Sequence, residues 1–279
     1  MDFNTYTEIS FKGSKNITRA YSNSFSLAVS MLPSEIRTGI YSIYGFVRLA
    51  DEIVDSFHDY DKETLLDRFC EETEYALKYG ISINPVIHCF QLTVKKYAIG
   101  KDLIDAFLSS MRKDLDTSNY SKEEYYRYIF GSADVVGLMC LKVFVGGNEV
   151  KYEQLKGQAM SLGSAFQKVN FLRDIKNDYE KLNRKYFPGI DMNTFSQRDK
   201  DLIIGEIKSD FKNAYQGIKA LPRSVRLSVF TAYAYYSKLL GKLEKTPPSD
   251  IMQARISIPQ HKKLRILAFS YFRFKMHFI

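Results

Sequence analysis

Two stretches of the sequence place acidic side chains at the spacing of one helix face. In the first stretch, Asp51 and Asp55 are four residues apart, so on a helix both side chains point to the same side. Arg48 lies three residues before Asp51, and Tyr44 lies four residues before Arg48. Like charges at this spacing destabilise an isolated helix by about 0.2–0.5 kcal/mol. A multivalent cation would reverse that cost, so the pattern indicates a metal site.

A second row of oxygen-bearing side chains follows later in the chain. Apolar residues such as Val169 and Leu172 flank it, so the row interrupts a face that should be buried. A single such row is usually a solvated helix face, but buried carboxylates are costly without a partner. Two rows that face each other would form a set of hard oxygen ligands suited to Mg²⁺, with Mn²⁺ as the alternative. The second row and its neighbouring arginine are Gln167, Asn170, Asp174, Asp178 and Arg173.

The arginines beside the two rows indicate what would share the metal ion. Arg48 and Arg173 carry planar guanidinium groups, which bind diphosphate through paired hydrogen bonds. Mg²⁺ in proteins often shares the phosphate oxygens of a substrate. We therefore predict a magnesium diphosphate site whose metal ligands are Asp51, Asp55, Asn170, Asp174 and Asp178.

The elements that position these rows are predicted to be helices. The chain has 279 residues with only 15 Gly and 7 Pro, its apolar residues recur at helical spacing, and no alternating strand pattern appears. We predict an all-α fold with residues 1–279 as a single domain. Helix starts are predicted at Pro33, Asp61, Asn84–Pro85, Asp102, Ser121 and about Glu149, helix ends near Gly80 and Gly100, and later breaks at Leu221–Pro222 and Thr246–Pro248.

Two of these segments contain residues that depart from a plain amphipathic helix. The helix that begins at Ser121 is predicted to run through Tyr125 to Phe144, and Asp134 stands in its apolar stretch. The segment Asn183–Thr194, which contains Pro188 and Gly189, is predicted to be a loop.

Cysteine usage and the chain ends bear on the compartment. The three cysteines, Cys70, Cys89 and Cys140, are far apart and form no Cys-x-x-Cys pattern, which excludes a zinc-finger or disulfide-framework protein. The first residues do not resemble a signal peptide. The apolar run near Val135–Leu141 is shorter than the ~18 residues of a spanning helix. We expect a cytoplasmic protein.

The net charge of +8 is concentrated at one end of the chain. No acidic residue follows Asp250, while six basic residues do. The rest of the chain is nearly balanced, which argues against a nucleic-acid-binding protein. Apolar residues recur here at steps of three and four, so the end could form a basic amphipathic helix on the inner membrane face or a helix packed on the body with a solvated basic edge. These apolar residues are Leu264, Leu267, Tyr271, Phe274 and Phe278.

Several motifs together resemble the squalene/phytoene synthase family. The segments Asp51–Asp55 and Asn170–Asp178 are similar to its two aspartate-rich motifs, and Arg184–Pro188 is similar to the flap that follows the second motif. Tyr128 and the run Gly131–Gly137 resemble the helix that lines the prenyl-chain tunnel. Weaker matches are Ser22 and Ser24 in the N-terminal serine segment, and Tyr236 and Arg255 near the C-terminal helices.

The resemblance implies a class I isoprenoid-synthase-type helical bundle with a central substrate cavity. It implies the head-to-head condensation of two geranylgeranyl diphosphates to phytoene through a cyclopropylcarbinyl diphosphate, with release of diphosphate. No NADPH requirement is expected, because no Gly-x-Gly-x-x-Gly motif is present. The implied catalytic residues are Asp51, Asp55, Asp174, Asp178, Tyr44 and Tyr128, and the implied substrate-binding residues are Ser22, Ser24, Arg48, Gln167, Arg173, Tyr186, Tyr236 and Arg255.

Other functions remain open from the sequence. A dehydrosqualene or squalene synthase would use farnesyl diphosphate and the same motifs. A terpene cyclase would use one prenyl diphosphate and a similar cage of Asp and Asn. A non-catalytic relative would be expected to have lost ligands that this chain retains, and a lipid-binding module explains the C-terminal segment but not the two acidic rows.

Overall fold

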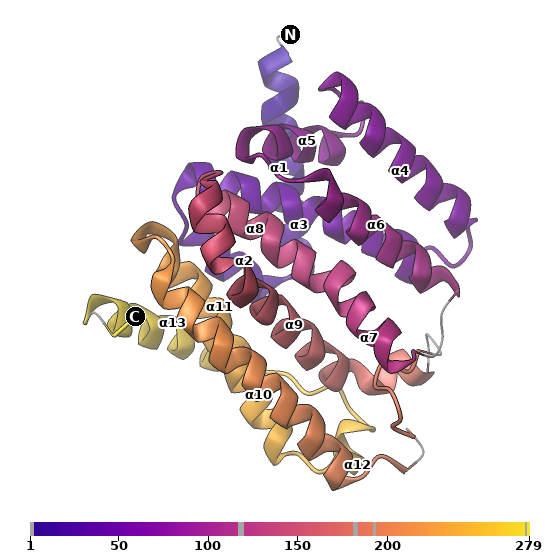
Figure 1. Ribbon diagram of the computed structural model, residues 1–279, viewed down its shortest axis with the longest axis vertical. Coiled ribbons are helices and arrows are strands. Elements are labelled where there is room, and N and C mark those ends of the chain that lie inside the picture. The colour runs from indigo at the N-terminus through magenta and orange to yellow at the C-terminus, as the bar shows by residue number, and fades with distance from the viewer. Residues whose placement is uncertain (1–2, 117–119, 181–183, 192–193, 277) are drawn as a thin grey trace.

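The protein folds into a stack of helices, in agreement with the predicted all-α class (Figure 1). The computed structural model describes residues 3–116, 120–180, 184–191, 194–276 and 278–279. Its helices are α1 (Phe3–Tyr21), α2 (Asn23–Ser30), α3 (Ser34–Asp55), α4 (Lys62–Tyr79), α5 (Pro85–Tyr97), α6 (Lys101–Asp116), α7 (Lys122–Ile129), the π-helical turn η1 (Phe130–Asp134), α8 (Val135–Phe144), α9 (Glu149–Glu180), α10 (Gln197–Ala220), α11 (Arg223–Lys245), α12 (Pro248–Ile251) and α13 (Gln260–Lys275).

Local sequence signals set several of these boundaries as predicted. Asp61 caps α4 by accepting a hydrogen bond from the Thr64 amide, and α4 ends at Gly80, which adopts a positive φ of 75°. Ser121 and Glu124 form a reciprocal capping box at the start of α7. These side chains satisfy backbone groups that a helix end leaves unpaired.

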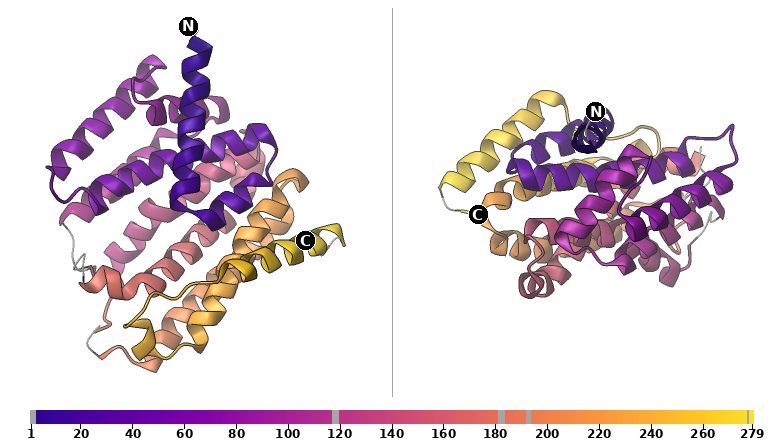
Figure 2. Two further views of the ribbon diagram at one scale, coloured as in Figure 1. Left: turned by 180° about the vertical axis from the view of Figure 1, so that it is seen from behind. Right: turned by 90° about the horizontal axis from the view of Figure 1, so that it is seen from above.

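Helix α9 lies at the centre of the arrangement and carries the second acidic row. It packs against α8, α10, α11 and η1, while α3, which carries the first row, packs against α1, α5, α6 and α8. Figure 2 shows α1 crossing the back of α3 and α13 lying outside α11. The rows therefore come from two long helices that are fixed by packing along much of their length.

Two hydrophobic clusters flank the region between these helices. The larger cluster centres on α3, α5, α6 and α8, where the rings of Phe46 and Phe90 stack with centroids 3.8 Å apart. The smaller cluster joins α7, α9, α10 and α11, and includes Phe171 and Tyr186. A cavity borders both clusters, since Val29 of the first and Phe171 of the second line it.

Some predicted helix boundaries need correction. The sequence analysis named no helix start before Pro33, and α1 and α2 lie in that part of the chain. Asp102 lies within the first turn of α6 rather than before it, and α5 ends at Tyr97, ahead of Gly100. Of the predicted loop Asn183–Thr194, residues 184–191 and Thr194 are described, and the other residues lie outside the described part of the chain.

The helix predicted to continue from Tyr125 to Phe144 is interrupted by η1. The backbone of η1 packs closely against α6 on one side and α9 on the other. A Cβ added at Gly131 would lie 2.8 Å from the Ala106 carbonyl oxygen of α6, and one added at Gly163 of α9 would lie 2.7 Å from the Ala133 carbonyl oxygen. Such π-helical turns are frequent at functional sites.

Candidate active site

The first acidic row lines the cavity from α3. Asp51, Asp55, Arg48 and Tyr44 all border it, as the single helix face predicted. Burial and the nearby charge of Asp55 raise the pKa of Asp51 to about 7. The Arg48 guanidinium pairs with Glu52 and lies 4.3 Å from the centre of the Tyr21 ring. Within this row, Asp51 is therefore a carboxylate whose charged form is disfavoured by burial.

The second acidic row lines the same cavity from α9. Gln167, Asn170, Asp174 and Asp178 border it together with Arg173. Burial and the neighbouring Asp174 raise the pKa of Asp178 to about 7. Asp174 accepts hydrogen bonds from Arg173 Nε at 3.1 Å and from Arg255 Nε at 2.6 Å.

Arg184 joins the two rows. Its Nη1 donates a hydrogen bond to Asp55 Oδ1 at 2.8 Å. Burial raises the pKa of Asp178, and the positive charge of Arg184 opposes that rise. Within the described residues, no three metal-binding side chains cluster closely enough to hold an ion in this side-chain arrangement. The donors nevertheless fit a hard cation, because they are carboxylate and amide oxygens and two of the carboxylates carry raised pKa values near neutrality.

Asp114 belongs to the site, although the sequence interpretation missed it. It lines the cavity, accepts a hydrogen bond from the Tyr128 hydroxyl at 2.8 Å and another from Tyr120 at 3.4 Å. Burial raises its pKa to about 7. One signal could have revealed it: Asp114 continues the buried face of α6 at helical spacing from Leu103, Phe107 and Ser110.

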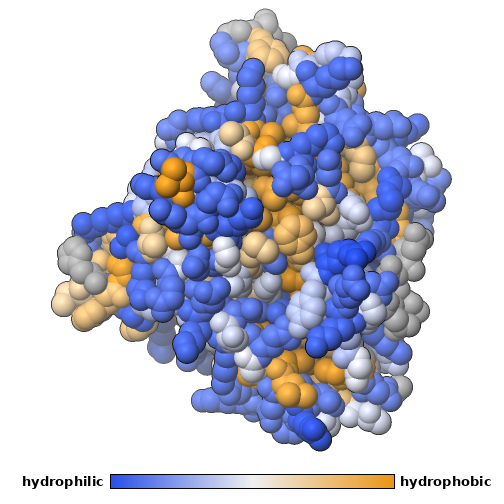
Figure 3. All heavy atoms as spheres, in the orientation of Figure 1, coloured by the Kyte–Doolittle hydropathy of each residue, from blue (hydrophilic) through white to orange (hydrophobic). Residues whose placement is uncertain are grey.

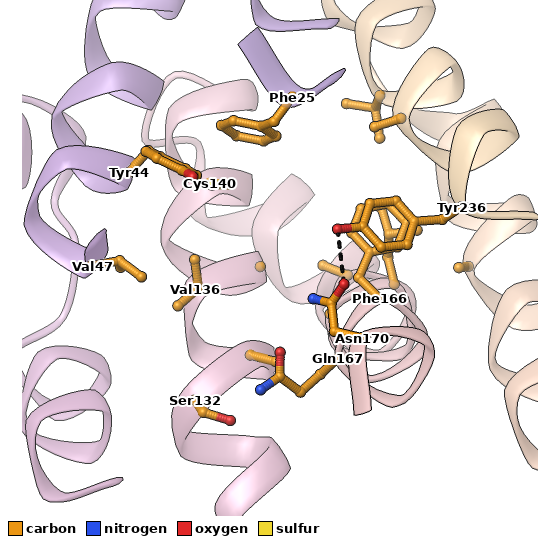
Figure 4. A pocket seen from close by; sticks show the side chains of 18 of the residues that line it. Phe25, Tyr44, Val47, Ser132, Val136, Cys140, Phe166, Gln167, Asn170 and Tyr236 are labelled. Carbon is orange, nitrogen blue, oxygen red and sulfur yellow. Dashed lines mark hydrogen bonds between the residues drawn. The ribbon is translucent and has the colours of Figure 1, made fainter. Parts of the chain in front are cut away.

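Aromatic rings form much of the cavity wall near the polar end. Phe166 and Tyr236 stack with centroids 4.0 Å apart, and the Tyr236 hydroxyl donates to Asn170 Oδ1 at 3.3 Å (Figure 4). Tyr128 and Tyr186 stack at 5.4 Å and both line the cavity. Burial raises the pKa of Tyr44 to about 12, so its ring stays neutral. Electron-rich faces of this kind stabilise cations.

Beyond these polar groups the cavity lining is mostly apolar. Its volume is about 460 Å³. Phe25, Val47, Val136 and Cys140 surround the open space in Figure 4. One end thus carries the two acidic rows, and the remainder could shield hydrocarbon from water.

Three predicted site residues do not line the cavity. Ser22 caps α2 by accepting a hydrogen bond from the Phe25 amide at 3.3 Å. Burial has the larger effect on the pKa of Tyr44 and raises it, whereas a hydrogen bond between Ser22 and Tyr44 lowers it. Ser24 is half-buried on α2. Arg255 is exposed but reaches Asp174. Substrate contact by these three residues stays a prediction.

The family model for squalene/phytoene synthase matches residues 18–262. The chain belongs to the squalene/phytoene synthase family. Members of this family are prenyltransferases of isoprenoid and carotenoid biosynthesis, and the match spans both acidic rows and most of the cavity lining.

Curated relatives in the squalene/phytoene synthase family include phytoene synthases. The chain is 27% identical to phytoene synthase of Arthrospira platensis, over 95% of this chain and 93% of that protein. It is 26% identical to chloroplastic phytoene synthase 1 of Zea mays, over 91% of this chain and 66% of that protein.

Solved structures of the squalene/phytoene synthase family share the fold. A dehydrosqualene synthase superposes with a TM-score of 0.83 at 20% identity, over 98% of this chain and 99% of that chain. The squalene synthase HpnC from Alicyclobacillus acidocaldarius superposes with a TM-score of 0.75 at 20% identity, over 86% of this chain and 94% of that chain. This confirms the predicted isoprenoid-synthase-type bundle.

Proposed function

We propose that the protein condenses two molecules of geranylgeranyl diphosphate head to head to give phytoene. The observation that carries this proposal is the convergence of both acidic rows, with their arginines, at one end of an apolar cavity. The curated phytoene synthase relatives support the choice of substrate and product.

The reaction balances as two ionisations. The first diphosphate leaves one substrate, the allylic cation bonds to the double bond of the second substrate, and one proton is lost to give the cyclopropylcarbinyl diphosphate. The second diphosphate then leaves, the ring opens, and loss of another proton gives phytoene. The departing diphosphate is a suitable base for the final proton.

The chain's own residues meet the needs of these steps. Arg48, Arg173 and Arg184 bind and orient diphosphate at the polar end of the cavity. The rings of Tyr44 and Tyr128 stabilise the passing carbocations, and the apolar wall excludes water that would quench them.

A divalent cation fits the same polar end. Mg²⁺, or Mn²⁺ in its place, would neutralise the charge that develops on the leaving diphosphate. The residues that would hold it are Asp51, Asp55, Asn170, Asp174 and Asp178. Asp114 also lines the cavity, but it belongs to neither acidic row.

Product analysis tests this function. Purified protein is incubated with Mg²⁺ and labelled geranylgeranyl or farnesyl diphosphate, with and without NADPH, and the hydrocarbon is identified. We expect phytoene from geranylgeranyl diphosphate without NADPH. A thirty-carbon hydrocarbon from farnesyl diphosphate alone would identify a dehydrosqualene or squalene synthase instead, and a cyclic product from one substrate would identify a terpene cyclase.

We also propose that the outer face of α13 binds an anionic membrane surface. Among the described residues no helix is long and apolar enough to cross a bilayer. Helix α13 nevertheless exposes apolar side chains, and the end of this helix reaches the left edge of the molecule in Figure 3, where apolar residues come to the surface. The exposed apolar residues are Leu264, Phe269, Tyr271, Phe272 and Met276, and exposed Lys262, Arg265 and Lys275 lie among them.

This combination of charge and exposed aromatic surface favours anionic lipid over a merely solvated edge. A peripheral location at the inner face of the membrane would let a hydrocarbon product pass into lipid. We expect co-sedimentation with phosphatidylglycerol vesicles, weakened by salt and by the double change Phe269→Ser and Phe272→Ser. The control is Ile83→Ser, since Ile83 is 89% exposed elsewhere. Equal binding by wild type and the double variant would refute this surface.

A further inference from the structure

Gln158 lines the cavity at the part of α9 that lies farthest along the helix from the acidic row. The cavity-lining residues of α9 run from Asp178 back to Leu155, and Gln158 is the polar residue among them farthest from the carboxylates. Gln158 precedes Asn170 by twelve residues, which is about 18 Å along a helix. A hydrocarbon chain whose diphosphate sits at Asn170 would therefore point its tail toward Gln158.

A second, smaller pocket lies on the other side of this wall. It has a volume of about 290 Å³, lies between α9 and α10, and is otherwise bordered by residues such as Lys151, Gln154 and Gln216. Leu155, Gln158 and Gly217 line both spaces. These three residues form the partition between the hydrocarbon cavity and an outer polar pocket.

Gln158 is the part of this partition that a substitution can open. Gly217 has no side chain, and a Cβ built there would collide with Gln158 Cβ, so the glutamine lies directly against the bare backbone of α10. Leu155 is 8% exposed and belongs to the larger hydrophobic cluster. Removing the Gln158 side chain would join the two spaces while leaving that cluster intact.

Gln158 is half-buried, yet one polar atom of its amide has no partner. Its Oε1 is buried and, among the described residues, has no hydrogen-bond partner. An unpaired buried polar atom costs about 1–3 kcal/mol, whereas Leu or Met would fill a similar volume without that cost. Packing alone therefore gives no reason for a glutamine here.

We propose that Gln158 is the end stop of the hydrocarbon cavity and sets the longest prenyl chain that the site accepts. This inference rests on the proposed function, because it takes the cavity to hold a prenyl diphosphate. A longer chain would need the space that the amide occupies. A shorter chain would leave part of the wall uncovered and lose contact area.

The test is a comparison of chain lengths in variants of Gln158. Binding of unreactive thiolodiphosphate analogues with fifteen, twenty and twenty-five carbons is measured by calorimetry in the presence of Mg²⁺, and kcat/KM is measured for the matching substrates. Gln158→Ala should improve the twenty-five-carbon ligand relative to the twenty-carbon ligand by at least about tenfold, since one methylene in an apolar pocket is worth about 10–200-fold. Gln158→Phe should shift preference toward fifteen carbons.

The matched control is Gln154→Ala, because Gln154 lies one turn earlier on α9 and borders only the outer pocket. Melting curves establish that each variant folds, and the opposite shifts expected for Gln158→Ala and Gln158→Phe keep the test decisive if one is unstable. An unchanged length profile in both variants, with wild type active, would overturn the end stop alone. Failure of wild type to bind any analogue would overturn the proposed function and the end stop together.

Discussion

Asp51 and Asp178 are buried carboxylates that lie beside other carboxylates, and this arrangement needs a physical reason. Burial, together with a neighbouring aspartate, raises the pKa of both Asp51 and Asp178 to about 7. Keeping such groups ionised is costly unless positive charge approaches them. A metal diphosphate complex with several arginines supplies that charge, so the arrangement costs stability in the free protein and is suited to binding.

Removing one carboxylate of a row tests its role directly. Asp174→Asn keeps the size of the side chain but removes the charge that Arg173 and Arg255 contact. We expect turnover to fall by at least about 100-fold, while the far-ultraviolet circular dichroism stays unchanged. Asp201→Asn, an exposed change on α10, should behave as wild type. Wild-type turnover by Asp174→Asn would contradict the site.

Asp134 gives a pH dependence that does not involve the acidic rows. It accepts a hydrogen bond from Ser164 at 2.7 Å, and burial raises its pKa to about 7. An unfolded aspartate titrates near 3.9, so the folded state holds the proton more tightly. The group therefore lowers stability progressively as the pH rises from about 4 to 7.

Asp134→Asn should remove this loss. Urea unfolding is expected to show a gain of about 1–3 kcal/mol at pH 8, and the gain should shrink toward pH 5. The exposed change Asp59→Asn should show no such trend. A gain that is equal at both pH values would show that burial of the Asp134 charge is not its origin.

At the scale of elements, the site depends on how closely α9 approaches η1. Gly163 provides that approach, because an added Cβ would lie 2.7 Å from the Ala133 carbonyl oxygen. Gly163→Ala should push the two elements apart, which destabilises the protein by about 1–3 kcal/mol and lowers activity by displacing Tyr128 relative to α9.

Gly157 offers the matched control on the same helix, since nothing lies within 4 Å of its added Cβ. Gly157→Ala should stabilise the protein by about 0.4–1 kcal/mol and leave activity unchanged. Thermal melts and steady-state rates check both variants. Equal effects at the two glycines would show that close approach at Gly163 is unimportant.

The sequence predicted those elements whose signals are local. Caps such as Asp61 and Ser121 act within one turn, and the acidic rows have the period of one helix, so helix starts and most site residues could be predicted. The turn η1 could not, because it accompanies contacts of Gly131 with α6 and of Gly163 with Ala133. The bridging role of Arg184 also escaped prediction, since Asp55 is 129 residues away in sequence.

At the scale of the whole molecule, the aromatic content has a structural reason. The chain has 20 Tyr and 20 Phe but no Trp, and many of these rings stack where the two hydrophobic clusters meet the cavity, as with Phe171 and Tyr186 at 3.9 Å. Large flat side chains can wall a cavity while the helices behind them stay packed. The fold thus combines an open interior with two solid clusters.

In the proposed reaction, the acidic rows act on two prenyl diphosphates and join them. The most direct measurement uses an equal mixture of unlabelled and deuterium-labelled geranylgeranyl diphosphate with Mg²⁺, followed by mass spectrometry of the hydrocarbon. We predict a forty-carbon product that includes a mixed species labelled in one half only, and its loss on chelation of the metal. Products that are only fully labelled or fully unlabelled, each with twenty carbons, would refute the condensation of two substrates.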